Sequence, residues 1–160
     1  MGKYDGKGNG SMVVSKDKAI GSASVRLSRK FTRIINFYLK SYNITTEQWS
    51  VLRTLNESDQ ITQKQLSERA DKDQATLTKI LDLLEKHGFV ERIPNPADRR
   101  SFLIKITEKG TNLSKEVTPY LEEIFTKITD HIEEDKLRIY QEVLVKLEGN
   151  IDDLLEKPND

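Results

Sequence analysis

The sequence predicts a mainly α-helical protein with one small β-hairpin, in the order four helices, hairpin, two helices. Apolar residues recur at three- and four-residue steps through most of the chain, which is the spacing of amphipathic helices. Between residues 89 and 106 the period changes to the two-residue alternation of strands. Two capping patterns, Thr45 with Gln48 and Thr62 with Gln65, mark where two of the helices begin. These observations define the fold class.

The chain opens with a glycine-rich stretch, residues 1–17, which we expect to be a flexible tail and in part a cloning remnant. A long helix is predicted from Lys18 to Tyr42, and Asn43 is a plausible stop. Its apolar residues fall on one face, while arginines and lysines occupy much of the remainder. This apolar face consists of Leu27, Phe31, Ile34, Ile35, Tyr38 and Tyr42.

Three shorter helices are predicted next. The second begins at Thr45 and is broken by the polar run at residues 57–60. The third is short and begins at Thr62. A tight connection leads to Asp73, a good N-cap, and the fourth helix runs to about His87. Gly88 lies where a left-handed C-terminal cap is expected.

The predicted hairpin has a first strand at Phe89 to Ile93, a polar loop over residues 94–101, and a second strand after it. In that second strand Phe102, Ile104 and Ile106 alternate with Leu103 and Lys105, so the first three are expected to face inward. Thr107 then caps the fifth helix, Pro119 is expected to bend it, and the sixth helix begins near Glu134 or Asp135.

Composition narrows the class of protein. There is no cysteine, which excludes disulfides, thiolate metal sites and thiol redox sensing. No apolar run is long enough to span a membrane, and the start lacks the apolar segment of a signal peptide. We therefore expect a cytoplasmic protein without membrane association. The net charge is +0, but residues 1–42 hold nine Lys or Arg against two Asp or Glu, and residues 111–160 hold six against thirteen. A basic surface on a neutral protein is compatible with this asymmetry, and so is ordinary surface variation.

The third and fourth helices read as a helix-turn-helix, in which the second helix enters the major groove of DNA. If the leucines and isoleucines of this second helix face the core, the residues on its opposite side face solvent. The outward residues proposed to contact bases are Gln74, Ala75, Thr76, Thr78 and Lys79. Backbone amides near Gln63, at the start of the third helix, suit a phosphate oxygen. A plain helical hairpin with a solvated polar face explains this segment equally well.

The residues at the hairpin tip favour the interpretation that the protein binds DNA. Arg99 and Arg100 lie on a proline-stiffened loop directly after the candidate recognition helix, and arginine at such a tip can enter the narrow minor groove. Asp98 is expected to hold one guanidinium by an ion pair. Charged hairpin tips are common, but a helix-turn-helix followed by a basic wing is more specific than either part. The sequence therefore predicts a winged helix-turn-helix.

The stretch from Asp73 to Arg92 resembles the recognition helix and first wing strand of the multiple antibiotic resistance regulator (MarR) family. The residues Asp98-Arg99-Arg100, and Leu103 to Gly110 after them, are similar to that family's D-x-R wing motif and its closing L-T-x-x-G, with Ile106 in place of the usual leucine. The resemblance covers about residues 18–155. It is dense in the central stretch and a match of length and pattern at the ends.

The resemblance implies a homodimer that binds a palindromic operator in double-stranded DNA, usually as a repressor. Residues 45–107 would form the winged DNA-binding domain, and residues 18–44 and 108–157 the helical dimerisation region. Arg100 matches the family's minor-groove arginine and Asp98 its orienting acid, while Arg99 is an additional charge assigned to phosphate. The apolar stripe of the sixth helix independently favours dimerisation.

The family often binds phenolic or aromatic acids, and Tyr38, Tyr42 and Trp49 could line a cleft for a small aromatic effector. At helical spacing, however, a place in the core is the better explanation of these aromatic residues. His87 and His131 supply too few ligands for a metal site, and no cofactor motif is found. The absence of a recognisable catalytic pattern argues against an enzyme. The alternative function is a winged-helix protein–protein interaction module in which the arginines form a docking patch.

Overall fold

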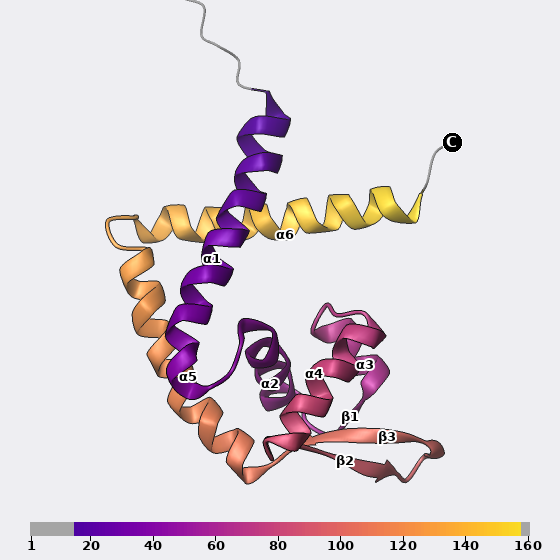
Figure 1. Ribbon diagram of the computed structural model, residues 1–160. Coiled ribbons are helices and arrows are strands. Elements are labelled where there is room, and N and C mark those ends of the chain that lie inside the picture. The colour runs from indigo at the N-terminus through magenta and orange to yellow at the C-terminus, as the bar shows by residue number, and fades with distance from the viewer. Residues whose placement is uncertain (1–14, 158–160) are drawn as a thin grey trace, which may run out of the picture. The chain divides into compact units, whose positions relative to one another are not determined.

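The computed structural model describes residues 15–157, and within this range the six predicted helices and the predicted hairpin follow one another in the predicted order (Figure 1). A π-helical segment, Asp17–Ser22, precedes α1, and a 3-10 turn, Lys40–Tyr42, follows it. The predicted tail lies outside the described residues as far as residue 14. The helices are α1 (Ala23–Leu39), α2 (Thr46–Glu57), α3 (Gln63–Arg69), α4 (Gln74–Lys86), α5 (Glu108–Ile128) and α6 (Glu134–Glu156), and the strands are β1 (Ile61–Thr62), β2 (Val90–Asn95) and β3 (Asp98–Ile106).

The chain divides into two compact units, Met1–Val117 and Thr118–Asp160, and the boundary falls within α5, one residue before Pro119. Proline removes one backbone donor from a helix and crowds the preceding turn. The helix nevertheless continues across Pro119 from Glu108 to Ile128.

The core of the first unit forms where α2 contacts α1, α3, α4 and β3. Four side chains of α4 point into this core, so the helix presents its remaining side to solvent. They are Leu77, Ile80, Leu81 and Leu84. Truncating such a leucine to alanine costs about 2–5 kcal/mol of stability. The fully buried large side chains of this core are Leu39, Val51, Leu52, Leu55, Leu66, Leu77, Leu81, Leu84, Val90, Ile104 and Val117.

The sheet has the strand order β1-β3-β2, and both pairings are antiparallel. Ile61 pairs with Ile104 and Thr62 with Leu103, so β1 supports only the inner part of β3. The sequence did not predict β1 as a strand, because two residues are too few to show an alternating pattern.

The hairpin is longer than predicted. The strands reach Asn95 and restart at Asp98, so most of the segment expected to be a polar loop is β-structure. Phe102 was expected to face inward, and this was wrong: it is 56% exposed, whereas Ile104 is 0% exposed. Phe102 pairs with Pro94, beyond the last residue of β3 that pairs with β1. The apolar alternation therefore continues past the end of the core.

Asp59, in the turn before β1, connects this turn to the inner end of β3 through hydrogen bonds. Its Oδ1 accepts hydrogen bonds from the backbone N–H of Ile106 at 2.9 Å and of Gln60 at 2.8 Å. Replacing Asp59 by Ala is expected to lower the free energy of unfolding by about 1–3 kcal/mol, because the Ile106 N–H loses its partner. Urea unfolding followed by circular dichroism measures this change. The Glu57→Ala variant, which removes an exposed carboxylate from α2, is the control, and an equal effect of both changes would contradict the assignment.

Candidate nucleic-acid interface

The α3-turn-α4 unit is held by caps that the sequence predicts. Thr62 and Gln65 form a capping box on α3, with a hydrogen bond of 3.1 Å from the Gln65 N–H to the Thr62 hydroxyl. In the turn, the Ser67 hydroxyl donates to the carbonyl of Lys72. The Lys72 ammonium lies 2.6 Å from a carboxylate oxygen of Glu47 on α2. These contacts fix the turn to the helix beneath it.

Asp73 is the N-cap of α4, as predicted. Two hydrogen bonds from Thr76, one from its backbone N–H at 2.8 Å and one from its hydroxyl at 2.7 Å, hold the pKa of the exposed Asp73 carboxyl below its ordinary value of 3.8. The charged cap also interacts favourably with the helix dipole.

The lowered pKa gives Asp73 a pH-dependent contribution to stability. A carboxyl with a lowered folded-state pKa stabilises the fold above its unfolded pKa and loses that contribution as the pH falls through the folded value. We expect wild type to lose stability relative to the Asp73→Asn variant below pH 3.8 and to keep a constant difference above it. Asparagine is a suitable comparison because it caps without titrating. Urea midpoints at a series of pH values measure this, and a difference that does not change with pH would contradict it.

The predicted base-reading residues all lie on the exposed side of α4: Gln74, Ala75, Thr76, Thr78 and Lys79. Two of their hydroxyl groups already have partners within the chain. Thr78 donates to the carbonyl of Gln74 at 2.9 Å and accepts from the side-chain amide of Gln63 at 2.7 Å. The second bond joins the start of α3 to the second turn of α4. The structure therefore brings Gln63 onto the same surface as the outer face of α4.

The hairpin tip is organised by backbone contacts. The Asp98 carboxylate accepts from the backbone N–H of Arg100 at 2.9 Å, and Asn95 accepts from that of Ala97 at 3.0 Å. The expected ion pair between Asp98 and an arginine guanidinium is wrong for the described structure: neither Arg99 nor Arg100 is within ion-pair distance of an acidic group there. Asp98 shapes the turn, and both guanidiniums remain exposed.

A hollow of about 300 Å³ lies where the start of α3, the start of α4 and the hairpin meet. It joins three of the predicted residues, Gln63, Gln74 and Arg100, whereas Lys79 and Arg99 lie outside its lining. Apart from Phe102, the residues that line it carry polar or basic side chains. The lining residues are Thr62, Gln63, Lys64, Gln74, Arg92, Arg100, Ser101 and Phe102.

Sequence reasoning missed Arg92 as a contributor to this surface. Its guanidinium lies 2.8 Å from Asp82 and 3.1 Å from Glu85, two carboxylates one turn apart on α4. Its side chain is 23% exposed, less than either partner. The spacing of Asp82 and Glu85 places them on one helix side, but nothing in the sequence shows which strand residue they meet.

None of the three residues predicted for an aromatic effector lines the hollow beside α3 and α4 or the cavity nearest to them in sequence. Trp49 is 4% exposed and belongs to the core, and Tyr38 and Tyr42 are half-buried. A cavity of about 440 Å³ nearby is lined by seven residues that include none of the three. These residues are Asn36, Lys40, Asn43, Ile44, Thr45, Gln48 and His87.

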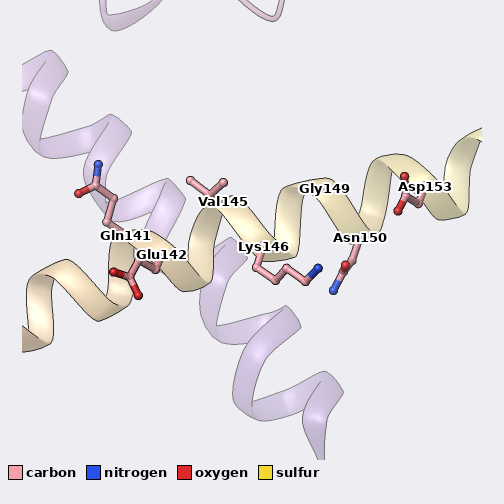
Figure 2. A pocket seen from close by; sticks show the side chains of 7 residues that line it. All are labelled: Gln141, Glu142, Val145, Lys146, Gly149, Asn150 and Asp153. Atoms are coloured by element: carbon pink, nitrogen blue, oxygen red, sulfur yellow. The ribbon is translucent and has the colours of Figure 1, made fainter.

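A shallow hollow of about 580 Å³ runs along one side of α6, remote in sequence from the predicted DNA-contact residues (Figure 2). Lys146 and Asn150 project from the same side of the helix in this view. Among the helices between residues 15 and 157, none has an apolar stretch of the length that a membrane span requires. The same range holds no group of three His, Asp or Glu side chains placed to share a metal ion.

The arrangement of three helices, a three-stranded sheet and a basic hairpin beside the exposed face of α4 defines a winged helix-turn-helix protein. Residues 44–102 match the MarR family. The chain is 30% identical over 122 residues to the multiple antibiotic resistance protein MarR of Escherichia coli (strain K12), covering 76% of this chain and 85% of that protein. It is 28% identical over 129 residues to MarR of Salmonella typhimurium, covering 80% of this chain and 90% of that one. The chain belongs to the MarR family of transcription regulators.

Solved structures agree with this assignment. A cysteine-to-serine mutant of E. coli MarR in complex with operator DNA is similar with a TM-score of 0.77 at 28% identity, covering 84% of this chain and 98% of that one. The MarR protein of Peptoclostridium difficile shares the fold with a TM-score of 0.79 at 20% identity, covering 96% of each chain.

Proposed function

We propose that the protein is a sequence-specific repressor that binds a palindromic DNA operator as a homodimer. The observation that carries this proposal is the surface on which the outer face of α4, the start of α3 and the basic hairpin tip lie together. Residues 45–107 would be the DNA-binding domain, and residues 18–44 and 108–157 the dimerisation region.

Each element of this surface has a distinct task in the proposal. Gln74, Thr76, Thr78 and Lys79 read base edges in the major groove, and Ala75 allows close approach or contacts a thymine methyl group. The two threonine hydroxyls would exchange their present partners or present their methyl groups. Gln63 binds a phosphate beside the groove, Arg100 enters the minor groove and Arg99 binds phosphate.

The unpartnered apolar surface of α6 supports the homodimer. None of the α6 residues is buried within the single chain. Leu154 is 75% exposed, which is costly for leucine in water and is relieved when a second copy covers it. Two copies would then place their recognition helices about 34 Å apart, one turn of DNA. Other exposed apolar residues of α6 are Ile139, Tyr140, Val143, Leu144, Val145, Ile151 and Leu155.

The proposal includes release by a small aromatic acid. A ligand that favours one separation of the two recognition helices shifts the dimer toward or away from the DNA-binding state. The test is to add hydroxybenzoates to the preformed operator complex. Bound ligand with unchanged operator affinity would overturn this part of the proposal.

The main experiment measures binding of the purified protein to the DNA beside its own gene by fluorescence anisotropy, with salt titration and excess random duplex. We expect saturable binding that survives the competitor, with two chains per palindrome. Binding abolished equally by random DNA would contradict a specific operator in this region. Absence of DNA affinity even at low salt would instead favour the alternative docking function, because phosphate contacts alone should give measurable affinity there.

A further inference from the structure

We propose that Arg92 is a positioning residue that fixes the angle between the recognition helix α4 and the wing, so that one chain can contact both grooves. The proposal rests on the DNA-binding function proposed above and adds a residue that is not itself assigned to DNA. The observation behind it is that one guanidinium on β2 contacts two carboxylates on α4, at 2.8 Å and 3.1 Å.

The register of the hairpin explains why an arginine at this position reaches the helix. Cross-strand partners in a sheet project to the same face. Arg92 pairs with Ile104 and Val90 pairs with Ile106. Val90, Ile104 and Ile106 are buried, so this face of the hairpin is turned toward the core. On β2, Arg92 is the charged residue of that face, and it lies where the apolar contacts end.

Few other contacts hold the outer part of the hairpin. The pairing of β1 with β3 ends at Leu103, and the register of β2 with β3 continues outward to Asn95 and Asp98. Arg92 therefore lies at the root of the segment that carries Arg100. Because the outer hairpin extends away from Arg92, a small rotation of the strands at Arg92 displaces the hairpin tip by a larger distance.

The charges at this site favour a positioning role over a phosphate contact. Arg92 carries one positive charge, and Asp82 and Glu85 carry two negative charges beside it. A phosphate would have to approach a group whose sum is negative, which is unfavourable. The two ion pairs also use both terminal nitrogens of the guanidinium, a geometry that fixes orientation better than a single contact does.

The first experiment is a double-mutant cycle on operator binding with Arg92→Gln, Arg100→Ala and the combined variant. We expect Arg92→Gln to weaken operator binding roughly tenfold and to reduce the further effect of Arg100→Ala to about a factor of two, because a displaced wing no longer delivers Arg100. The Lys105→Gln variant is the matched control: it removes one positive charge and the 3.5 Å ion pair with Glu91 from the same hairpin. Additive losses from the two arginine changes would overturn the proposal.

The second experiment replaces the carboxylates by Asp82→Asn and Glu85→Gln together. A positioning role predicts weaker operator binding, even though the variant is more positive overall. A direct phosphate contact by Arg92 predicts tighter binding, because Arg92 would be freed and two negative charges removed. Tighter binding would overturn the proposal. This variant keeps the test valid if Arg92→Gln fails to fold.

A third measurement needs no DNA. The chain has no cysteine, so spin labels can be placed specifically at Ala97→Cys on the hairpin tip and Lys86→Cys on α4. We expect Arg92→Gln to broaden the distribution of distances between the labels, with Lys105→Gln leaving it unchanged. An unchanged distribution in Arg92→Gln would overturn the proposal. If wild type binds no operator but the distribution broadens, the proposed function fails and the positioning role stands.

Discussion

Replacing Gly110 by alanine is expected to destabilise the fold by about 3 kcal/mol or more. A Cβ at Gly110 would lie 2.3 Å from the backbone oxygen of Phe89 and 2.8 Å from Cγ1 of Ile106. The oxygen cannot easily move, because it accepts a hydrogen bond of 3.0 Å from the backbone N–H of Thr107. Glycine is therefore required where the start of α5 packs against the backbone of Phe89, between α4 and β2, for lack of space and not for an unusual φ.

Gly149 provides the control for this prediction. It lies on α6, where an added Cβ would meet nothing within 4 Å. Alanine is a better helix former than glycine by roughly 1 kcal/mol, so Gly149→Ala should be neutral or stabilising. Urea unfolding at equal protein concentration compares the variants, since any dimer would make stability depend on concentration. A Gly110→Ala protein as stable as wild type would show that the contact can relax.

Replacing Arg100 by alanine is expected to weaken operator binding about 10- to 100-fold, the range for losing one well-placed groove contact. The loss should be largest for operators with A·T-rich flanks, where the minor groove is narrow and its negative potential strongest. Arg99→Ala, by contrast, should weaken binding to all duplexes similarly and lower the salt slope by about 1. This difference separates the two neighbouring arginines.

Anisotropy titrations of both variants against operators with A·T-rich and G·C-rich flanks measure these effects. The stability of each variant should match wild type, because both side chains are exposed and make no ion pair with an acidic group in residues 15–157. Equal losses for Arg99→Ala and Arg100→Ala on every duplex would contradict a minor-groove role for Arg100.

Periodicity and capping chemistry were sufficient to predict the helices. The Thr45, Thr62 and Asp73 caps were identified from residue type and spacing, and the structure confirms all three. These signals are local, since each cap bonds a residue three positions away. The short strand β1 carried no such signal, because its identity depends on pairing with β3 more than 40 residues later in the chain. Long-range pairing of this kind leaves no local pattern.

The part of the candidate site that depends on local spacing could also be predicted from the sequence. Outward residues of α4 follow from its inward leucines. The hydrogen-bond partner of Asp98 could not be predicted in this way. A short acidic side chain can accept a hydrogen bond from a backbone N–H two residues later as readily as from a guanidinium, and Asp98 accepts from the backbone in this structure. The two ion pairs of Arg92 join positions seven and ten residues apart, across the change from helix to strand. Such a contact depends on the turn geometry at Gly88, where φ is +78°.

The two ends of β3 differ in how many strands they pair with, and this difference affects which substitutions the surface can tolerate. Its inner residues are paired on both sides and buried, whereas the segment from Asp98 to Phe102 is paired with β2 alone and is mostly exposed. An isolated two-stranded ribbon is marginally stable and can open without unfolding the domain. Substitutions in this outer ribbon are therefore expected to cost little folding stability, so they can alter the proposed DNA contacts without unfolding the domain. We expect substitutions at the tip to be tolerated more readily than substitutions in the buried strands that carry it.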